Sequence, residues 1–441
     1  MRPPRYQAIV DDIAARIHAG QLRPGDRLPT VRALMAQHGI ALATASRVMA
    51  ELAAAGLVVG EVGRGSFVRD ASLPRGSGLE QQGTRAGLID LTFSYPTVPG
   101  QDDMLREGLR SLAAAGDLDA LLHSAPQGGR PHERQTMARH LRNRGIRVAA
   151  DQVLITNGAQ HGLAVTLMAL LKPGDVLAVD ALSYPGLLAL ARTQRLEIQP
   201  LPQAEGRTDL DALARLCKRR PVRAIYTMPT MHNPLGSVMP EADRRRLAAI
   251  AGQHDLLIIE DATYAFLAEP APRPIATHAP QRTVYVTGLS KSVAAGLRVG
   301  LLAVPPAMVP PLSQAIRLSS WQAASVTTAL GCLWIESGRV DALEDAKRAD
   351  ARERQALARR VLRGRPLVAH RSSYFLWLPL PAGQRAEAVA AELKRSGVLV
   401  NTAQPFAATE RVPQALRVAL GSIDRGVLAE ALATIGSAMD A

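Results

Sequence analysis

Apolar residues near the start of the chain recur at the spacing of helices. Ile9, Ile13 and Ile17 stand four residues apart, so one face of this segment is apolar. Thr30, just after a proline, is placed to cap the start of a second helix. The pattern predicts helices over about 6–19, 30–38 and 42–55, followed by two short strands around a glycine turn within 56–68. Three helices and a small hairpin are typical of a winged helix-turn-helix.

A different alternation begins near residue 88. Short apolar runs, each long enough for a strand, are separated by longer segments with helical spacing. The strand candidates are 153–155, 176–179, 224–226, 256–259 and 283–286. This order predicts a mostly parallel sheet covered by helices. The last part of the chain has a helix, a strand over 374–378 and a helix again, which indicates a smaller α/β lobe.

Composition changes between these two parts. Residues 71–88 are rich in glycine and polar residues, which is typical of a flexible linker. We therefore predict an α+β winged helix-turn-helix head over 1–70, a linker over 71–88 and an α/β body over 89–441. The large lobe of the body is expected at about 89–334 and the small lobe at about 335–441.

Charge and cysteine content bear on partners and environment. The 441 residues have a net charge of +13, but the head has only nine arginines against six acidic residues, so charge alone is weak evidence for nucleic-acid binding. No apolar run approaches the roughly 18 residues of a membrane span. Two distant cysteines, Cys217 and Cys332, fit a reducing compartment. We expect a cytoplasmic protein, nucleoid-associated when bound to DNA, with no metal site and no membrane partner.

Five residues of the body carry the chemistry that a carbonyl cofactor needs. The amine of Lys291, just after a strand-like run, is of the kind that holds such a cofactor as a Schiff base. A carboxylate keeps a pyridine nitrogen protonated, and Asp261 follows an apolar strand. Asn233 and Tyr264 offer hydrogen-bond donors to a phenolic oxygen, and Arg417 suits the carboxylate of an amino acid. The pattern favours pyridoxal phosphate.

A phosphate group is bound by backbone N–H groups at a helix start, together with hydroxyls or cations. Gly158, Ala159 and Gln160 precede an apolar helix and offer the N–H groups. Ser290 and Arg298 offer the hydroxyl and the charge. These residues are the candidates for holding the phosphate of the cofactor.

Each candidate has an ordinary alternative. Tyr184 could stack on the cofactor ring, although a tyrosine in such a place more often only packs. A lone lysine after a strand is usually solvated, an Asn-Pro dipeptide is usually a turn, and an arginine is usually on the surface. The occurrence of the whole set in one α/β domain is what favours a cofactor site.

Residues 88–441 resemble the fold-type I pyridoxal-phosphate-dependent aminotransferases of the aspartate aminotransferase group. The matching segments are Gly158-Ala159-Gln160, Asn233-Pro234-Leu235-Gly236, Asp261-Ala262-Thr263-Tyr264, Ser290-Lys291, Gly296-Leu297-Arg298-Val299-Gly300 and Leu416-Arg417-Val418. The resemblance implies Lys291 as the catalytic lysine, with the other residues in the roles given above. One position departs from the pattern, because relatives often carry a hydroxyl residue where this chain has Gly288. That difference would weaken phosphate binding or shift it to Ser290 and Thr287.

The head has its own candidates for binding double-stranded DNA. In a winged helix the third helix enters the major groove, and the wing reaches the neighbouring backbone or minor groove. Thr44, Ser46 and Arg47 on the third helix, Arg32 on the second and Arg64 at the wing tip are the predicted DNA-binding residues. The alternative is a helical protein-interaction module with incidental arginines.

Residues 6–69 resemble the winged-helix domain of the GntR family of bacterial regulators, on the segments 24–32, 51–58 and 63–68. A head of this type joined to an aminotransferase-like body is the plan of the MocR subfamily. That resemblance implies a homodimer, in which the head of one subunit can pack on the body of the other.

We therefore predict a transcriptional regulator that binds operator DNA and senses pyridoxal phosphate, or an amino acid joined to it. One alternative is a working aminotransferase that carries an accessory DNA-binding head. Another is a body that serves as a dimerisation scaffold without cofactor.

Overall fold

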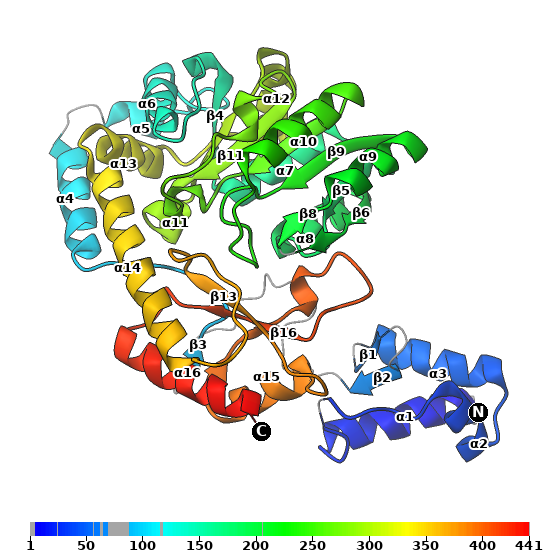
Figure 1. The fold of residues 1–441 in the computed structure, drawn as a ribbon. Coiled ribbons are helices and arrows are strands. Elements are labelled where there is room, and N and C mark those ends of the chain that lie inside the picture. Colours follow the sequence, from blue (N-terminus) through cyan, green and yellow to red (C-terminus); the bar gives the residue numbers. More distant parts are fainter. Residues whose placement is uncertain are drawn as a thin grey trace.

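The computed structural model describes residues 5–23, 25–55, 57–61, 65–68, 88–114, 118–204 and 206–440. Its head contains the helices α1 (Arg5–His18), α2 (Val31–His38) and α3 (Leu42–Ala54) and the antiparallel strands β1 (Val58–Glu61) and β2 (Gly65–Val68) (Figure 1). The three predicted helices and the two predicted short strands are confirmed, while the turn between the strands, residues 62–64, lies outside the described residues. The predicted linker falls almost wholly on 69–87, outside the described residues.

Local sequence signals set the helices of the head. The hydroxyl of Thr30 accepts a hydrogen bond from the backbone N–H of Ala33 at 3.2 Å, so the predicted N-cap of α2 is confirmed. Ile9 and Ile13 of α1 are buried against Leu34 of α2, in a core that also includes α3. The head therefore has a hydrophobic core of its own.

The large lobe is built on a seven-stranded sheet with the order β4-β12-β11-β10-β9-β5-β6. The strands are β4 (Val153–Asn157), β5 (Val176–Asp180), β6 (Glu197–Leu201), β9 (Val222–Thr227), β10 (Leu257–Asp261), β11 (Thr283–Gly288) and β12 (Val299–Ala303). All pairs are parallel except those of β12, which runs antiparallel to both of its neighbours. The predicted mostly parallel sheet is confirmed.

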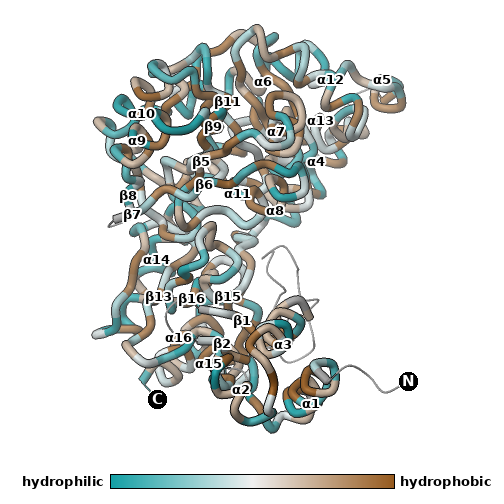
Figure 2. Tube along the Cα trace, turned by 90° about the vertical axis from the view of Figure 1, so that its right-hand side faces the viewer, coloured by the Kyte–Doolittle hydropathy of each residue, from teal (hydrophilic) through white to brown (hydrophobic). Residues whose placement is uncertain are grey.

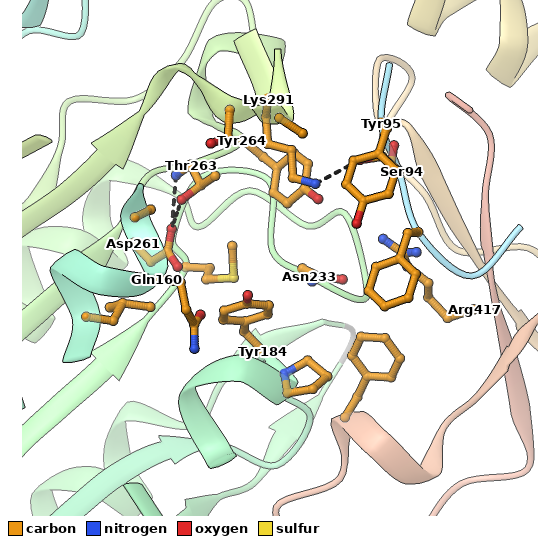
Figure 3. A pocket seen from close by; sticks show the side chains of 18 of the residues that line it. Ser94, Tyr95, Gln160, Tyr184, Asn233, Asp261, Thr263, Tyr264, Lys291 and Arg417 are labelled. Atoms are coloured by element: carbon orange, nitrogen blue, oxygen red, sulfur yellow. Dashed lines mark hydrogen bonds between the residues drawn. The ribbon is translucent and has the colours of Figure 1, made fainter. Parts of the chain in front are cut away.

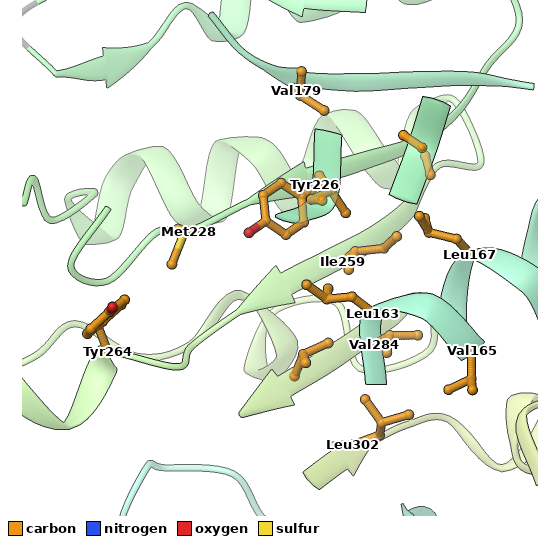
Figure 4. Packing of buried hydrophobic residues seen from close by; sticks show 14 of the residues in the cluster. Leu163, Val165, Leu167, Val179, Tyr226, Met228, Ile259, Tyr264, Val284 and Leu302 are labelled. Carbon is orange, nitrogen blue, oxygen red and sulfur yellow. The ribbon is translucent and has the colours of Figure 1, made fainter. Parts of the chain in front are cut away.

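Helices cover both faces of this sheet. Side chains of α7 and α12 pack with Ile259, Val284 and Leu302 on one face, as Figure 4 shows for α7. The neighbouring residues Ile258 and Leu301 point to the other face, because successive side chains of a strand alternate. The helices of this lobe are α4 (Gln101–Ala114), α5 (Asp119–Leu122), α6 (Pro131–Arg142), α7 (Ala159–Leu170), α8 (Pro185–Thr193), α9 (Leu210–Arg219), α10 (Glu241–Gln253), α11 (Leu289–Ser292), α12 (Val309–Ser320) and α13 (Ser325–Glu336), and a small hairpin joins β7 (Gln203–Ala204) to β8 (Arg207–Thr208).

The long helix α14 (Arg339–Val361) leads from the large lobe to the small lobe (Figure 1). The small lobe has a sheet with the order β13-β16-β15 and two covering helices. Its elements are β13 (Phe375–Pro379), α15 (Ala386–Arg395), β14 (Val398–Leu399), β15 (Asn401–Thr402), β16 (Ala415–Ala419) and α16 (Arg425–Asp440).

The body begins in the small lobe. Strand β3 (Ile89–Asp90) pairs in parallel with β14 of the small lobe, and the chain crosses to the large lobe only afterwards. The large lobe was predicted to start at about residue 89. The sequence gives no sign of this pairing, because β3 has two residues and its partner lies about 300 positions away.

The head lies against the small lobe, with β2 near α15 in both views (Figures 1 and 2). The guanidinium carbon of Arg385 stands 3.6 Å from the centroid of the Phe67 ring. At Gly25, where φ is +87°, a Cβ atom would stand 2.7 Å from the Cβ of Ala388. The contact is therefore close enough to require glycine at this turn. Among the described residues, no helix is long and apolar enough to cross a membrane.

Candidate functional site

A cavity of about 370 Å³ lies at the carboxyl ends of the central strands, next to the small lobe (Figure 3). The structure brings ten of the eleven body residues predicted for the site into its lining: Ala159, Gln160, Tyr184, Asn233, Asp261, Tyr264, Ser290, Lys291, Arg298 and Arg417. The eleventh, Gly158, lies beside Arg298. These residues come from segments spread over about 260 positions of the chain, so the fold assembles them.

Lys291 stands in α11, one helical turn that begins where β11 ends. Its Nζ donates a hydrogen bond to the backbone oxygen of Ser94 at 2.7 Å. The same atom lies 5.0 Å from the ring centroid of Tyr95 and 5.6 Å from that of Tyr264. A half-buried amine between two aromatic rings is therefore directed into the cavity.

Asp261 is the last residue of β10 and is almost fully buried. Its Oδ2 accepts a hydrogen bond from the hydroxyl of Tyr226 at 2.9 Å, and its Oδ1 accepts two from Thr263. Burial raises the pKa of Asp261, while these hydrogen bonds act in the opposite direction. A cation placed beside this carboxylate would offset its desolvation, so the position suits a protonated ring nitrogen.

The start of α7 and the side chain of Arg298 form a site suited to an anion. Gly158 precedes α7 with φ at +81°, and a Cβ atom there would stand 2.6 Å from Nη2 of Arg298. That Nη2 donates to the backbone oxygen of Asn157 at 3.3 Å. The hydroxyl of Ser290 is buried without a hydrogen-bond partner. Free N–H groups at a helix start, a guanidinium and an unpaired hydroxyl are what a phosphate requires.

The structure explains the glycine at position 288. A Cβ atom on Gly288 would stand 2.6 Å from the backbone oxygen of Val299 in the neighbouring strand, so no hydroxyl residue fits there. Of the two substitutes expected from the sequence, Thr287 does not line the cavity, and its hydroxyl donates to the backbone oxygen of Ala262 at 3.4 Å. Ser290, the other of the two, does line the cavity.

Tyr184 and Gln160 form the wall beside α8. A Cβ atom on Gly186 would stand 2.5 Å from Cζ of Tyr184, so this glycine leaves room for the aromatic ring. Nε2 of Gln160 donates to the backbone oxygen of Gly186 at 3.0 Å. Burial, and then the charge of Asp261, raises the pKa of Tyr184, so its hydroxyl stays protonated.

Arg417 lies on β16 of the small lobe and is only 4% exposed. Its Nη1 donates to the backbone oxygen of Thr92 at 2.8 Å, while its Nε has no partner. Burial lowers the pKa of this guanidinium. Its guanidinium also lies 4.8 Å from the centroid of the Phe375 ring, and Tyr264 is a further hydrogen-bonding neighbour. Because none of these neighbours is a carboxylate, this position suits the carboxylate of a ligand.

The sequence assigned no roles within the segment Thr92–Tyr95, which lines the cavity between Lys291 and Arg417. Its contribution includes backbone oxygens, and every residue type has one, so the sequence does not report these contacts. Asn401 donates from Nδ2 to the oxygen of Thr92 at 2.8 Å and was missed as well. Thr263, the second partner of Asp261, could have been found from its place two residues after that carboxylate.

The residues present fit pyridoxal phosphate. Buried polar atoms without partners surround the cavity, namely Oδ1 of Asn233, Oε1 of Gln160, Oγ of Ser94, Oγ of Ser290 and Nε of Arg417. Unpaired buried polar groups are costly, so a polar ligand at this place would relieve an existing penalty.

The predicted DNA-binding residues of the head differ in their surroundings. Arg32 and Ser46 are exposed, whereas Thr44 is half-buried. Arg47 stacks on the ring of Tyr6 at 4.1 Å and donates to its hydroxyl at 3.0 Å, so α1 holds this guanidinium. Arg64 lies outside the described residues.

Comparison with known proteins supports the same division into head and body. The fold and the cavity define an aminotransferase-like body with a winged-helix head. Residues 86–435 match the family described as "Aminotransferase class I and II", and residues 5–68 match "Bacterial regulatory proteins, gntR family". The chain belongs to the aminotransferase class I and II family and carries a GntR-type head. The predicted fold class, family resemblance and pyridoxal phosphate cofactor are confirmed.

Individual relatives are similar along most of their length. The HTH-type transcriptional regulator YdeF of Bacillus subtilis is 29% identical over 95% of this chain and 90% of its own. The 2-aminoadipate transaminase of Thermus thermophilus is 26% identical over 83% of this chain and 96% of its own. The structure of an archaeal alanine:glyoxylate aminotransferase has a TM-score of 0.74 at 23% identity, covering 81% of this chain and 91% of its own, which shows a shared fold.

We predict that Gly158→Ala weakens binding of pyridoxal phosphate at least about tenfold, because the new methyl group displaces Arg298 and strains a backbone conformation reserved for glycine. Pyridoxal, which lacks the phosphate, should bind as it does to the wild type. Absorbance titrations in the visible range measure both affinities. Gly252→Ala is the control, since a Cβ atom there meets nothing within 4 Å. An equal loss for both ligands would contradict the phosphate assignment.

Proposed function

We propose that this protein is a transcriptional regulator whose head binds double-stranded operator DNA and whose body senses pyridoxal phosphate, or an amino acid condensed with it. The observation that carries the proposal is a complete lysine, aspartate and arginine set around one cavity, on a chain that also has a GntR-type head. The relative YdeF, named an HTH-type transcriptional regulator, matches this chain along nearly its whole length. In this proposal the head, residues 1–70, binds DNA, and the body, residues 89–441, senses the ligand. Residues 71–88 link the head to the body.

The residues of the cavity divide the work of binding. Lys291 would hold the cofactor through its amine, Asp261 would keep the ring nitrogen protonated, and Arg298 with Ser290 would hold the phosphate. Asn233 and Tyr264 would donate to the phenolic oxygen. When bound, pyridoxal phosphate supplies an aldehyde that amino acids condense with and a ring that accepts electrons.

A specific segment supports coupling between ligand and DNA. Thr92–Tyr95 follows β3, the first element after the predicted linker, and its backbone oxygens accept hydrogen bonds from Lys291 and Arg417. A cofactor aldehyde on Lys291 or a carboxylate on Arg417 would compete with those oxygens. A ligand that displaces the segment binds the protein more tightly when the segment is displaced than when it is in place. Such a difference in affinity is what shifts an equilibrium between two states.

The head would read DNA with the exposed surface of α3. We propose that Ser46 and Thr44 contact base edges. Arg32 and Arg64 would contact the phosphates of the DNA backbone or the edge of a guanine. Arg47 would either leave Tyr6 to reach DNA or brace α3 from α1.

An apolar surface next to the cavity favours a homodimer. The large hydrophobic side chains Leu122, Leu318 and Trp321 are 83%, 74% and 50% exposed, and Leu118 and Val326 are exposed as well. Hydrogen bonds from Arg130 to Ala120 and Ser325, and from Ala125 to Gln322, hold the segments that carry these side chains next to one another. Asn157, whose backbone oxygen accepts from Arg298, also donates from Nδ2 to the backbone oxygen of Gln322 at 3.1 Å, so this surface borders the phosphate end. A second copy of the chain is the proposed occupant.

A catalytically active aminotransferase with an accessory head is the second candidate. It is favoured by the complete residue set and by similarity to a protein named 2-aminoadipate transaminase. Conversion of the bound cofactor to its amine form by amino acids at around 1 s⁻¹ or faster would support it. Absence of a visible absorption band after purification with pyridoxal phosphate would instead support the scaffold alternative.

The central test is Lys291→Ala. We expect the wild type to bind its upstream DNA with an affinity that changes about fivefold or more on adding pyridoxal phosphate, within the usual range of allosteric coupling. The variant should keep basal DNA binding and lose that change, because the ligand has no amine to join. Fluorescence anisotropy at fixed salt measures both. A wild type that binds this DNA no better than random DNA would refute the regulatory role.

Ser422→Ala tests the connecting segment. The hydroxyl of Ser422 donates to the backbone oxygen of Phe93 at 2.6 Å and accepts from the N–H of Tyr95 at 2.9 Å, so it clamps the segment to the small lobe. Without the clamp, we expect ligand binding to persist while its effect on DNA affinity falls toward none. Ser437→Ala on α16 is the control, since that hydroxyl donates within its own helix. An unchanged coupling in Ser422→Ala would exclude the segment as the link.

Leu318→Glu tests the homodimer. A carboxylate at the centre of an apolar interface costs several kcal/mol unless it is paired, so the variant should sediment as a monomer where the wild type is a dimer. Because the surface borders the phosphate end, binding of pyridoxal phosphate should weaken with it. Leu109→Glu, at a half-exposed position on α4, is the control. A wild type that sediments as a monomer would contradict the proposed dimer.

A further inference from the structure

Lys347, in the middle of α14, is a lysine with no exposed surface. Its Nζ donates hydrogen bonds to the backbone oxygen of Val293 at 2.6 Å and to that of Lys291 at 3.2 Å. Both acceptors belong to the segment that carries the cofactor lysine. The side chain of Lys347 thus contacts the backbone of Lys291, and Lys347 itself does not line the cavity.

Stability alone gives no reason for a charged group here. Among the described residues, no carboxylate lies within ion-pair distance of Lys347, although Glu344 and Asp350 stand nearby on the same helix. Burial, and then the charge of Lys291, lowers the pKa of Lys347 to about 7. An apolar side chain of the same length often serves a buried position equally well, so a retained amine suggests a specific task.

The two hydrogen bonds fix the end of a very short helix. α11 consists of Leu289–Ser292, and the last carbonyls of a helix lack partners within it. Lys347 supplies a donor for two of these oxygens, and Gln101 adds a second donor to the oxygen of Val293 at 2.8 Å. The backbone of Lys291 is therefore held from behind, while its side chain reaches across to Ser94.

The same helix position is tied to the small lobe. The hydroxyl of Tyr374 donates to the backbone oxygen of Lys347 at 2.9 Å. The backbone oxygen of Tyr374 in turn accepts from the N–H of Leu420 at 2.7 Å, just after β16. A short chain of hydrogen bonds thus runs from the small lobe through Lys347 to the backbone of Lys291.

We propose that Lys347 is a positioning residue that orients Lys291 toward the bound cofactor and ties that orientation to α14 and the small lobe. The inference rests on the proposed role of Lys291 as the cofactor lysine. It assigns Lys347 no contact with the cofactor itself.

Lys347→Met tests the proposal, because methionine fills a similar volume without a donor. We expect the affinity for pyridoxal phosphate to fall about tenfold, the order expected when a buried hydrogen-bond acceptor loses its donor. We also expect the visible circular dichroism of the bound cofactor, which reports its orientation, to weaken, and the pH dependence of the visible band to shift. Lys347→Arg, which keeps a cationic donor, should recover part of both signals. If Lys347→Met does not fold, Lys347→Leu, which also lacks a donor, is measured in its place with the same expected result.

Gln355→Met is the matched control. Gln355 is also buried on α14, and its Nε2 donates to the backbone oxygens of Ser373 at 2.8 Å and Phe375 at 3.1 Å. It should lose thermal stability without the spectral changes. Equal spectral changes in both variants, or wild-type spectra and affinity in Lys347→Met, would overturn the inference. A wild type without any visible band would overturn the cofactor assignment, and this inference with it.

Discussion

Three backbone segments meet at one end of the large sheet so closely that side chains are excluded. A Cβ atom on Gly300 would stand 2.3 Å from the backbone of Gly158, and one on Gly288 would stand 2.6 Å from that of Val299. Because β12 runs antiparallel, it starts where β4 and β11 end. Arg298 before β12, Lys291 after β11 and the start of α7 therefore arrive at one place. A side chain at any of these glycines would push the strands apart and separate the groups of the cavity.

The cavity holds several charged side chains that are shielded from water. Their hydrogen-bond partners are neutral groups of the protein. Lys291 and Arg417 bind backbone oxygens, and Asp261 binds hydroxyls and an N–H group. Such partners satisfy hydrogen bonds without neutralising charge, so part of the desolvation penalty remains. A ligand with an anionic phosphate, a carboxylate and a protonated ring nitrogen carries the complementary charges. The charged groups of the cavity are therefore already placed for such a ligand.

The small lobe connects the cavity with the DNA-binding head. It supplies Arg417 to the cavity, pairs β14 with the first strand of the body and contacts the head through α15. The segment Thr92–Tyr95 continues from that first strand into the cavity. Any ligand-dependent movement of the small lobe would therefore reach the head through the contact of Arg385 with Phe67.

The sequence by itself determined the local elements and most of the cofactor candidates. Helical spacing, the Thr30 cap and short apolar runs depend on neighbouring residues, and residues such as Lys291 and Asp261 carry side chains with recognisable chemistry. Only the tertiary structure decided the rest. The segment Thr92–Tyr95 acts largely through backbone oxygens, and Lys347 reaches Lys291 from 56 positions away, so neither leaves a local pattern. The need for glycine at position 288 likewise arises from the close approach of the neighbouring strand, and that approach is a property of packing.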